Sequence, residues 1–160
     1  MAADAPLPPF LSRISDLPAD FEGLLADADA DGFQALRRLE AEWHSGENRF
    51  ARTGEGLFLA AVDGASVGIC GLNRDPFGDA DVARVRRLFV RPRFRRQGIA
   101  RALVGRVEEA AGAWSDWIQL RTHDETADAF YRALGYLPVI GEAHVTHRKQ
   151  LRDATRRADR

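Results

Sequence analysis

Residues 87–109 read RLFVRPRFRRQGIARALVGRVEE, and this stretch joins the end of a strand, a basic turn and the start of a helix. The apolar run that closes at Val90 is typical of a buried strand, and Pro92 stops it because proline cannot donate to a sheet ladder. From Gly98 onward apolar residues recur at intervals of three and four, which predicts an amphipathic helix. Its apolar positions are Ile99, Ala100, Leu103, Val104, Val107 and Ala111.

The turn between this strand and this helix suits an anion such as a diphosphate. The first amides of a helix have no partners within it, and the helix dipole adds positive charge there. Gly98 lets the backbone approach a phosphate, and Arg95, Arg96 and Arg101 are counter-charges. Residues 84–107 contain nine arginines and no acid, in a chain whose net charge is -1. The alternative is a helix that simply begins at Gly98, with a solvated arginine face.

Length and composition indicate one soluble domain. A chain of 160 residues suits a single core, expected over about 10–151, with flexible tails at 1–9 and 152–160. No apolar run approaches the roughly 20 residues that cross a bilayer, and the N-terminal segment does not resemble a signal peptide. We therefore expect a cytoplasmic protein without a membrane partner. The single cysteine, Cys70, lies in an apolar run and is expected to be buried rather than catalytic.

The remaining pattern predicts an α+β, or mixed α/β, fold. Asp63-Gly64 favours a tight hairpin turn, and Gly135 is placed to end a helix. Strands are expected within 10–17 and over 57–62, 66–73, 82–90, 117–122, 136–140 and 144–151; helices are expected over 21–43, with a break around 29–32, from 98, and over 125–134.

Three segments together resemble the GNAT superfamily of acyl-CoA-dependent N-acyltransferases. Residues 95–100, RRQGIA, match its Arg/Gln-x-x-Gly-x-Gly/Ala signature, placed between a strand and a helix. Residues 87–92, RLFVRP, resemble its hydrophobic fourth strand, and residues 127–136, ADAFYRALGY, resemble its late helix. The resemblance is good over 83–136, holds in pattern only over 57–73, and hardly extends to the N-terminal third.

The resemblance implies a central, mostly antiparallel twisted sheet of six to seven strands flanked by about four helices. It implies acetyl-CoA as co-substrate without a metal, the Val90 N–H as an oxyanion donor, and Tyr131 as the group that protonates the leaving thiolate. The residues implied to contact the cofactor are Leu88, Phe89, Val90, Arg95, Arg96, Gln97, Gly98, Ile99, Ala100, Arg101 and Asp124. Tyr131 is alternatively a core residue, although Phe130 looks better suited to the core.

The implied reaction is direct attack of a neutral amine, from a small molecule or a protein, on the acyl carbonyl. The alternative function is a non-catalytic acyl-CoA-binding module on the same fold. Nucleic-acid binding is disfavoured because the chain lacks net positive charge and interleaved aromatic residues. A homodimer stays open because the sheet leaves edge strands.

Departures from the family pattern concern the general base and the acceptor. The fourth strand carries Arg84, Arg86 and Arg87 in place of a carboxylate base. Base candidates are Asp75, Asp79, Asp81 and His123, and each is also explained as a turn or surface residue. Asp124 or Thr122 is alternatively a helix N-cap. His144 and His147 are expected on opposite sides of a strand, so that they share no metal. We expect the acceptor channel between the first helices, the 74–80 loop and the 140–147 turn.

Overall fold

The computed structural model describes residues 8–151, so most of the predicted N-terminal tail and all of the C-terminal tail lie outside the described residues. One sheet holds seven strands in the order β1-β2-β3-β4-β5-β7-β6. The strands are β1 (Phe10–Ile14), β2 (Gly56–Val62), β3 (Ala65–Arg74), β4 (Ala83–Val90), β5 (Trp117–Leu120), β6 (Leu137–Pro138) and β7 (His147–Gln150). Among the strands of residues 8–151, only β4 and β5 pair in parallel, which confirms the predicted α+β fold with a mostly antiparallel sheet.

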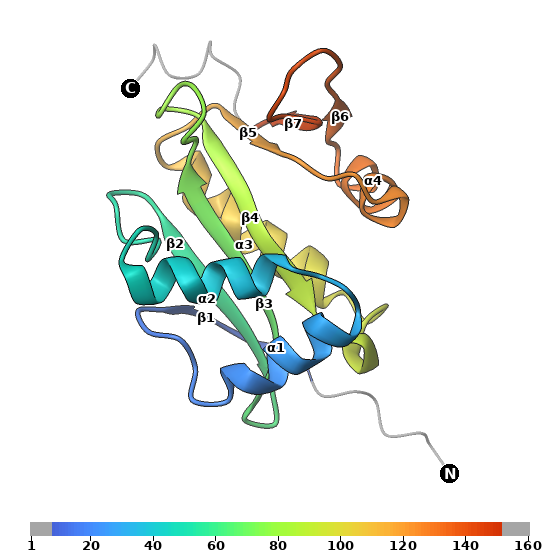
Figure 1. Ribbon diagram of the computed structural model, residues 1–160. Helices are drawn as coiled ribbons and strands as arrows, with labels where there is room; N and C mark the ends of the chain where they lie inside the picture. Colours follow the sequence, from blue (N-terminus) through green and yellow to red (C-terminus); the bar gives the residue numbers. More distant parts are fainter. Residues whose placement is uncertain (1–7, 152–160) are drawn as a thin grey trace.

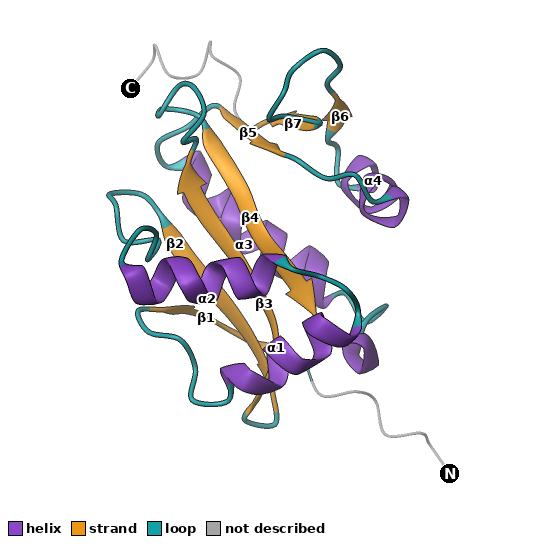
Figure 2. Ribbon diagram, in the orientation of Figure 1, coloured by secondary structure: helices purple, strands orange, loops and turns teal. Residues whose placement is uncertain are grey.

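Four α-helices flank this sheet, as predicted. They are α1 (Phe21–Ala30), α2 (Ala35–Ser45), α3 (Ile99–Gly112) and α4 (Glu125–Ala133), and a short 3₁₀ turn, η1 (Pro92–Phe94), precedes α3. Figure 1 shows α1 and α2 in front of the sheet and α3 behind it, and Figure 2 shows the same layers by element type. Among residues 8–151 no helix is long and apolar enough to cross a membrane.

Each face of the sheet has its own hydrophobic cluster. On the α3 side, Leu103 and Val107 pack against Val67 and Val85. On the side of α1 and α2, buried residues such as Leu24 and Leu39 pack against residues of β2, β3 and β4. Successive strand residues point to opposite faces, which explains why β3 reads as an almost continuous apolar run.

The hairpin between β2 and β3 is confirmed. Asp63 and Gly64 both have positive φ, 51° and 78°, which is the backbone of a two-residue turn matched to the twist of the strands. Cys70 is fully buried in β3, as expected. The end of α4 is also confirmed: Gly135 has a φ of 93°, and the Tyr136 amide donates to Tyr131 O at 3.0 Å, closing the helix by a Schellman motif.

The last two strands are shorter than predicted. β6 contains only Leu137 and Pro138, and Gly141, with a φ of 86°, turns the chain before β7. Proline donates no hydrogen bond to a ladder, so the pattern of apolar residues overestimated this strand. His144 consequently lies in a turn rather than in a strand, and the expectation that it shares a strand with His147 is wrong.

Candidate active site

β4 and β5 run side by side at only one end. Their parallel pairing joins Ala83 to Ile118 and Arg84 to Gln119, and beyond these pairs β5 turns away from β4 (Figures 1 and 2). On its other side β4 stays paired with β3 as far as Val90. The second half of β4 therefore presents an open backbone edge, with which an extended ligand can form hydrogen bonds.

A β-bulge interrupts this second half of β4. Arg87 and Leu88 together lie opposite Cys70 of β3, and Arg87 has a φ of 59°. The extra residue changes which side chains face which helices. Before the bulge Val85 packs on the α3 side, whereas after it Phe89 packs on the side of α1 and α2.

The end of β4 directs the Val90 amide toward the open edge. The Arg91 amide donates to Val67 O at 2.8 Å, and donors along an antiparallel strand alternate between its two sides. The Val90 N–H therefore points away from β3, into the space between β4 and β5. Arg95 lies along the same edge, because its Nε donates to Val90 O at 2.9 Å.

The N-terminus of α3 presents three free amides. The first bond of the helix runs from the Ala102 amide to Gly98 O at 3.0 Å, and among the described residues the amides of Ile99, Ala100 and Arg101 have no acceptor. Gly98 is exposed in the left-handed region, with a φ of 81°, and a Cβ placed there would meet no atom within 4 Å. Open space above three free amides fits an anionic group such as a diphosphate.

The predicted counter-charges differ in their surroundings. Arg95 forms an ion pair with Asp31, just beyond α1. Arg96 and Arg101 are exposed and pair with no acid among residues 8–151, and Gln97 is exposed beside them. The side chains of the remaining predicted contacts are occupied by packing. Ile99 is buried, Leu88 is partly buried, Ala100 packs against the α3-side cluster, and Phe89 stacks on Phe33 at 5.5 Å.

Tyr131 of α4 is a buried residue that belongs to the same hydrophobic cluster as Val90. It is 6% exposed, and its ring meets that of Tyr136 edge-on at 5.3 Å. The expectation that Phe130 is the better core residue is wrong: Phe130 is only partly buried, because the buried face of the helix is the one that meets Tyr136. Burial raises the pKa of Tyr131 well above 10. Among the described residues its hydroxyl has no hydrogen-bond partner.

Asp124 is the N-cap of α4. Its Oδ1 accepts a hydrogen bond from the Thr126 amide at 3.0 Å. Two residues earlier, Thr122 Oγ1 accepts a hydrogen bond from the Asp124 amide at 3.3 Å. The capping alternative is therefore confirmed for Asp124, and its contact with the cofactor stays a prediction.

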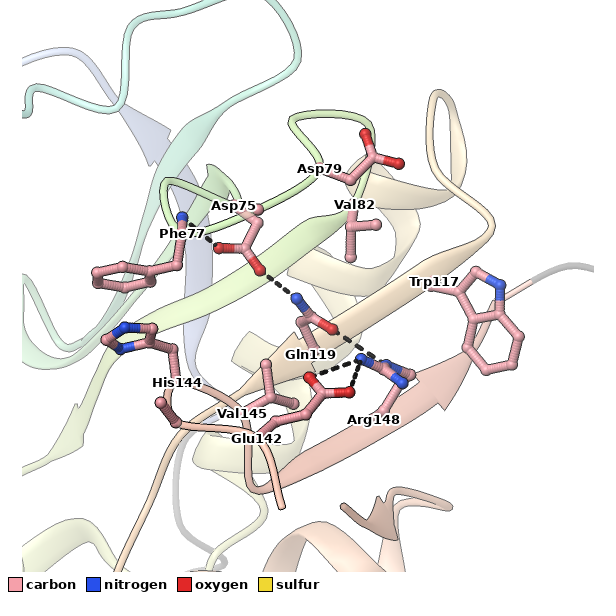
Figure 3. Close-up of a pocket in the computed structure, with 12 residues that line it drawn as sticks. Asp75, Phe77, Asp79, Val82, Trp117, Gln119, Glu142, His144, Val145 and Arg148 are labelled. Atoms are coloured by element: carbon pink, nitrogen blue, oxygen red, sulfur yellow. Dashed lines mark hydrogen bonds and ion pairs between the residues drawn. The ribbon is translucent and has the colours of Figure 1, made fainter. Parts of the chain in front are cut away.

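A cavity of about 500 Å³ lies where β4 and β5 are still paired (Figure 3). Phe77 and Asp79 of the 74–80 loop line it together with Glu142 and His144 of the 140–147 turn, and the rings of Phe77 and His144 stack at 4.1 Å. These are two of the three segments expected to form the acceptor channel. The third expected segment, the first helices, does not line this cavity, because neither α1 nor α2 contributes a lining residue.

Most of the candidate general bases form hydrogen bonds with residues close to them in the sequence. Asp75 is buried rather than exposed, with Oδ1 accepting from the Phe77 amide at 2.8 Å and Oδ2 accepting from Gln119 Nε2. Asp79 caps its own turn by accepting from the Asp81 amide at 2.9 Å. His123 is exposed and accepts a hydrogen bond from its neighbour Arg121. The Asp81 carboxylate lies 3.7 Å from Arg74. Of the four candidates, Asp75 and Asp79 line the cavity, and each already accepts a hydrogen bond from a backbone amide.

Three polar residues of the cavity have no counterpart in the sequence analysis. Arg148 donates to Gln119 Oε1 at 3.0 Å and forms an ion pair with Glu142 at 3.2 Å. They come from β7, β5 and the turn before β7, and only the pairing of β5 with β7 brings them together. No motif in the sequence marks them. Among residues 8–151 no group of three or more His, Cys, Asp or Glu side chains is placed to hold a metal ion.

Comparison with known proteins places this geometry in a family. The model of the acetyltransferase (GNAT) family matches residues 20–136, well beyond the segment in which the motifs were recognised. The crystal structure of a candidate acetyltransferase from Exiguobacterium sp. 255-15 is similar with a TM-score of 0.80 and 29% identity, covering 96% of this chain and 98% of that one. An uncharacterized protein of Mycobacterium leprae is 28% identical over 123 residues. The match covers 71% of this chain but only 33% of the Mycobacterium leprae protein, so this chain spans about a third of that protein's length.

A more distant structure shares the fold. The GNAT family N-acetyltransferase YhbS from Escherichia coli, crystallised in complex with CoA, has a TM-score of 0.68 and 17% identity, and the match covers 96% of this chain and 87% of that one. The parting of β4 from β5, the bulge at Arg87 and the glycine at the start of α3 are thus found in a chain that a family model matches over most of its length. This chain belongs to the GNAT acetyltransferase family.

Proposed function

We propose that this chain transfers the acetyl group of acetyl-CoA to the amine of an acceptor. The observation that carries the proposal is the joint placement of two kinds of free backbone donor. The Val90 N–H faces the open edge of β4, and nine residues later the chain presents the first of the free amides of Ile99, Ala100 and Arg101. A molecule with a diphosphate and an extended arm that contains amides engages both.

The residues have distinct tasks in binding. The three amides at the start of α3, with Arg96 and Arg101 beside them, bind the diphosphate. Gly98 keeps the surface above these amides open. The edge of β4 from Leu88 to Val90 pairs with the amide-bearing arm, as a strand pairs with its neighbour. The ion pair of Arg95 with Asp31 leaves Arg95 to hold the turn rather than to neutralise the ligand.

The chemistry needs positioning and two proton movements. Bound acetyl-CoA supplies a thioester carbonyl. The Val90 N–H stabilises the negative charge that develops on its oxygen while a neutral amine nitrogen forms the new bond to carbon. Tyr131 is protonated at neutral pH, and burial raises its pKa further. It donates its proton to the departing sulfur, the nitrogen loses a proton to water, and the tyrosinate regains a proton from water. The enzyme forms no covalent bond in this scheme.

Calorimetric titration with CoA and an acetylation assay test the proposal together. The assay follows thiol release from acetyl-CoA in the presence of a panel of amines, with mass spectrometry of the amine products. We expect binding of CoA and amine-dependent thiol release. Binding without turnover of any amine would instead favour the non-catalytic acyl-CoA-binding module. Absence of CoA binding would refute both functions.

A further inference from the structure

Three arginines of β4 lie on the side of the sheet that α2 covers. Arg84 and Arg86 alternate with Ala83 and Val85, which pack on the α3 side. Arg87 also faces this side, because its backbone is left-handed at the bulge. These residues, Arg84, Arg86 and Arg87, are called the β4 arginine cluster below. The cluster begins where β4 and β5 are still paired and ends at the open edge.

Within residues 8–151, two carboxylates balance the β4 arginine cluster. Arg87 Nη2 lies 3.0 Å from Glu42 Oε1 of α2, and Arg84 Nη1 lies 3.7 Å from Asp75 Oδ2. Arg86 has no hydrogen bond or ion pair with any residue in the described part of the chain. Three guanidinium groups against two carboxylates leave one positive charge, and it is carried by a partly buried side chain. A half-buried cation without a partner is unfavourable until an anion joins it.

The electrostatics of the cluster agree with this count. Burial and, after it, the neighbouring charges of Arg87 and Arg84 together lower the pKa of Arg86 to about 10, although Glu42 and Asp75 oppose the shift. The pKa of Arg84 is also lowered, first by burial, while Asp75 opposes the shift. Both groups stay charged at neutral pH. An anion bound beside them therefore relieves repulsion that the protein does not relieve itself.

Hydrogen-bond donors in the cluster exceed the acceptors around them. Arg84 is 4% exposed, and it donates only from Nη2, to His144 O at 2.6 Å. Its Nε and Nη1 are buried without a hydrogen-bond partner within residues 8–151. Buried polar groups are nearly always hydrogen-bonded, so donors of this kind mark a place for a ligand or water. The free Nε of Arg87 is less informative, because the equally free Oε2 of Glu42 can take it by a small rotation.

The cluster lies within a short molecule's length of the proposed reaction centre. Arg86 pairs with Gly71 and Val90 pairs with Gly68 on β3. Three residues of strand span about 10 Å. A carboxylate held at Arg86 and an amine near the Val90 N–H are therefore expected to lie several bonds apart in one acceptor.

We propose that the acceptor is an amine that also carries a carboxylate, which the partly buried Arg86 binds beside the buried positive charge of Arg84. A carboxylate is favoured over a phosphate because its single charge matches the one unbalanced guanidinium. The inference rests on the proposed acetyl transfer and adds the class of acceptor to it. Amino acids whose amine and carboxylate are several bonds apart fit the spacing of about 10 Å along β4 best.

The test measures acetylation of matched pairs of amines. Each pair consists of an amino acid and its carboxamide, with an aminoalkyl phosphonate of the same length as a third member. We expect kcat/KM for the amino acid to exceed that for the carboxamide by about 10- to 100-fold, the effect of a hydrogen-bonded ion pair. Arg86→Gln should remove this preference by raising KM for the amino acid, with the carboxamide unaffected. Arg86→Lys should restore part of it.

The control variant is Arg38→Gln, which removes one positive charge from an exposed position of α2. It should leave the preference unchanged. Equal rates for amino acid and carboxamide, or a preference that survives Arg86→Gln, would overturn the inference while acetyl transfer stands. Preference for the phosphonate would overturn the choice of a carboxylate. If no amine is acetylated, the proposed function fails and the inference fails with it.

Discussion

Arg91 Nε donates to Asp27 Oδ2 at 2.6 Å, and this ion pair joins the residue after β4 to helix α1. The arginine side chain is 18% exposed and the aspartate side chain 30%. The basic segment and the acidic first helix, far apart in the sequence, are therefore partners within one molecule. The pairs Arg91–Asp27, Arg95–Asp31 and Arg87–Glu42 attach α1, α2 and the turn between them to β4 and the turn after it.

The first prediction concerns the stability that this attachment provides. Asp27→Asn should lower the free energy of unfolding by about 1 kcal/mol, because it weakens a partly buried charged hydrogen bond. The matched control is Asp29→Asn, whose partner Arg37 is half exposed, and it should have little effect. Urea unfolding at low and high salt measures both. Equal losses in the two variants would show that burial of the Arg91 pair contributes nothing.

The second prediction concerns the diphosphate site. Gly98→Glu should abolish CoA binding, because it places a carboxylate above the free amides of α3. Any side chain at Gly98 is strained by the positive φ of 81°, so Gly98→Ala separates strain from charge and should retain measurable binding. Gly105→Glu, on an exposed position of the same helix with open space around it, should bind normally. Unchanged CoA affinity of Gly98→Glu in calorimetry would refute the assignment.

The third prediction concerns proton donation by Tyr131. Tyr131→Phe should lower kcat by about 100-fold or more, the usual contribution of a general acid, with CoA binding retained. The control is Tyr136→Phe: this neighbouring hydroxyl is buried without a hydrogen-bond partner within residues 8–151, so its removal should leave turnover and stability intact or slightly improved.

The pH profile of the wild type belongs with this prediction. Burial raises the pKa of Tyr131 well above 10, so the hydroxyl keeps its proton through the range in which the amine becomes neutral. The rate should therefore rise with pH up to about 10, as the acceptor loses its proton, without a falling limb below that value. A loss of rate between pH 7 and 9 that disappears in Tyr131→Phe would contradict this.

The fourth prediction separates two roles of Asp124. Asp124→Ala should destabilise the fold by about 1 kcal/mol through loss of the N-cap of α4, whereas Asp124→Ser should keep most of the stability. If Asp124 also contacts the cofactor, both variants should weaken CoA binding. Thermal unfolding and calorimetry read the two effects separately. Weakened binding in Asp124→Ala alone would assign the whole effect to capping.

Local patterns in the sequence predicted the strand, turn and helix around Gly98, because their signals lie within a few residues of one another. The hairpin at Asp63-Gly64 was predictable for the same reason. The bulge at Arg87 was not, since a register shift depends on the partner strand β3 and leaves no signature in β4 alone.

Contacts between residues far apart in the sequence could not be predicted either. The segment 84–107 looked like a basic zone for a ligand, yet Arg91 and Arg95 are neutralised by acids of the first helical region. The burial of Asp75 depends on Gln119 and Arg84, which approach it only in the folded sheet. Tyr131 exceeded Phe130 in burial because Tyr136 and His147 decide which face of α4 is covered.

The bulge at Arg87 shifts the alternation of side chains along β4 by one residue. Odd-numbered positions such as Val85 face α3 before it, and the even-numbered Val90 does so after it. One face of a single strand is thereby divided into a charged half, with Arg84 and Arg86, and an apolar half, with Phe89. If the same sequence paired without the bulge, its register would slip by one residue and Phe89 and Val90 would exchange faces. Deletion of one of the two residues opposite Cys70 would instead restore regular pairing with Phe89 and Val90 on the faces that they now occupy. Relatives that are one residue shorter at this position would therefore keep the same division of β4.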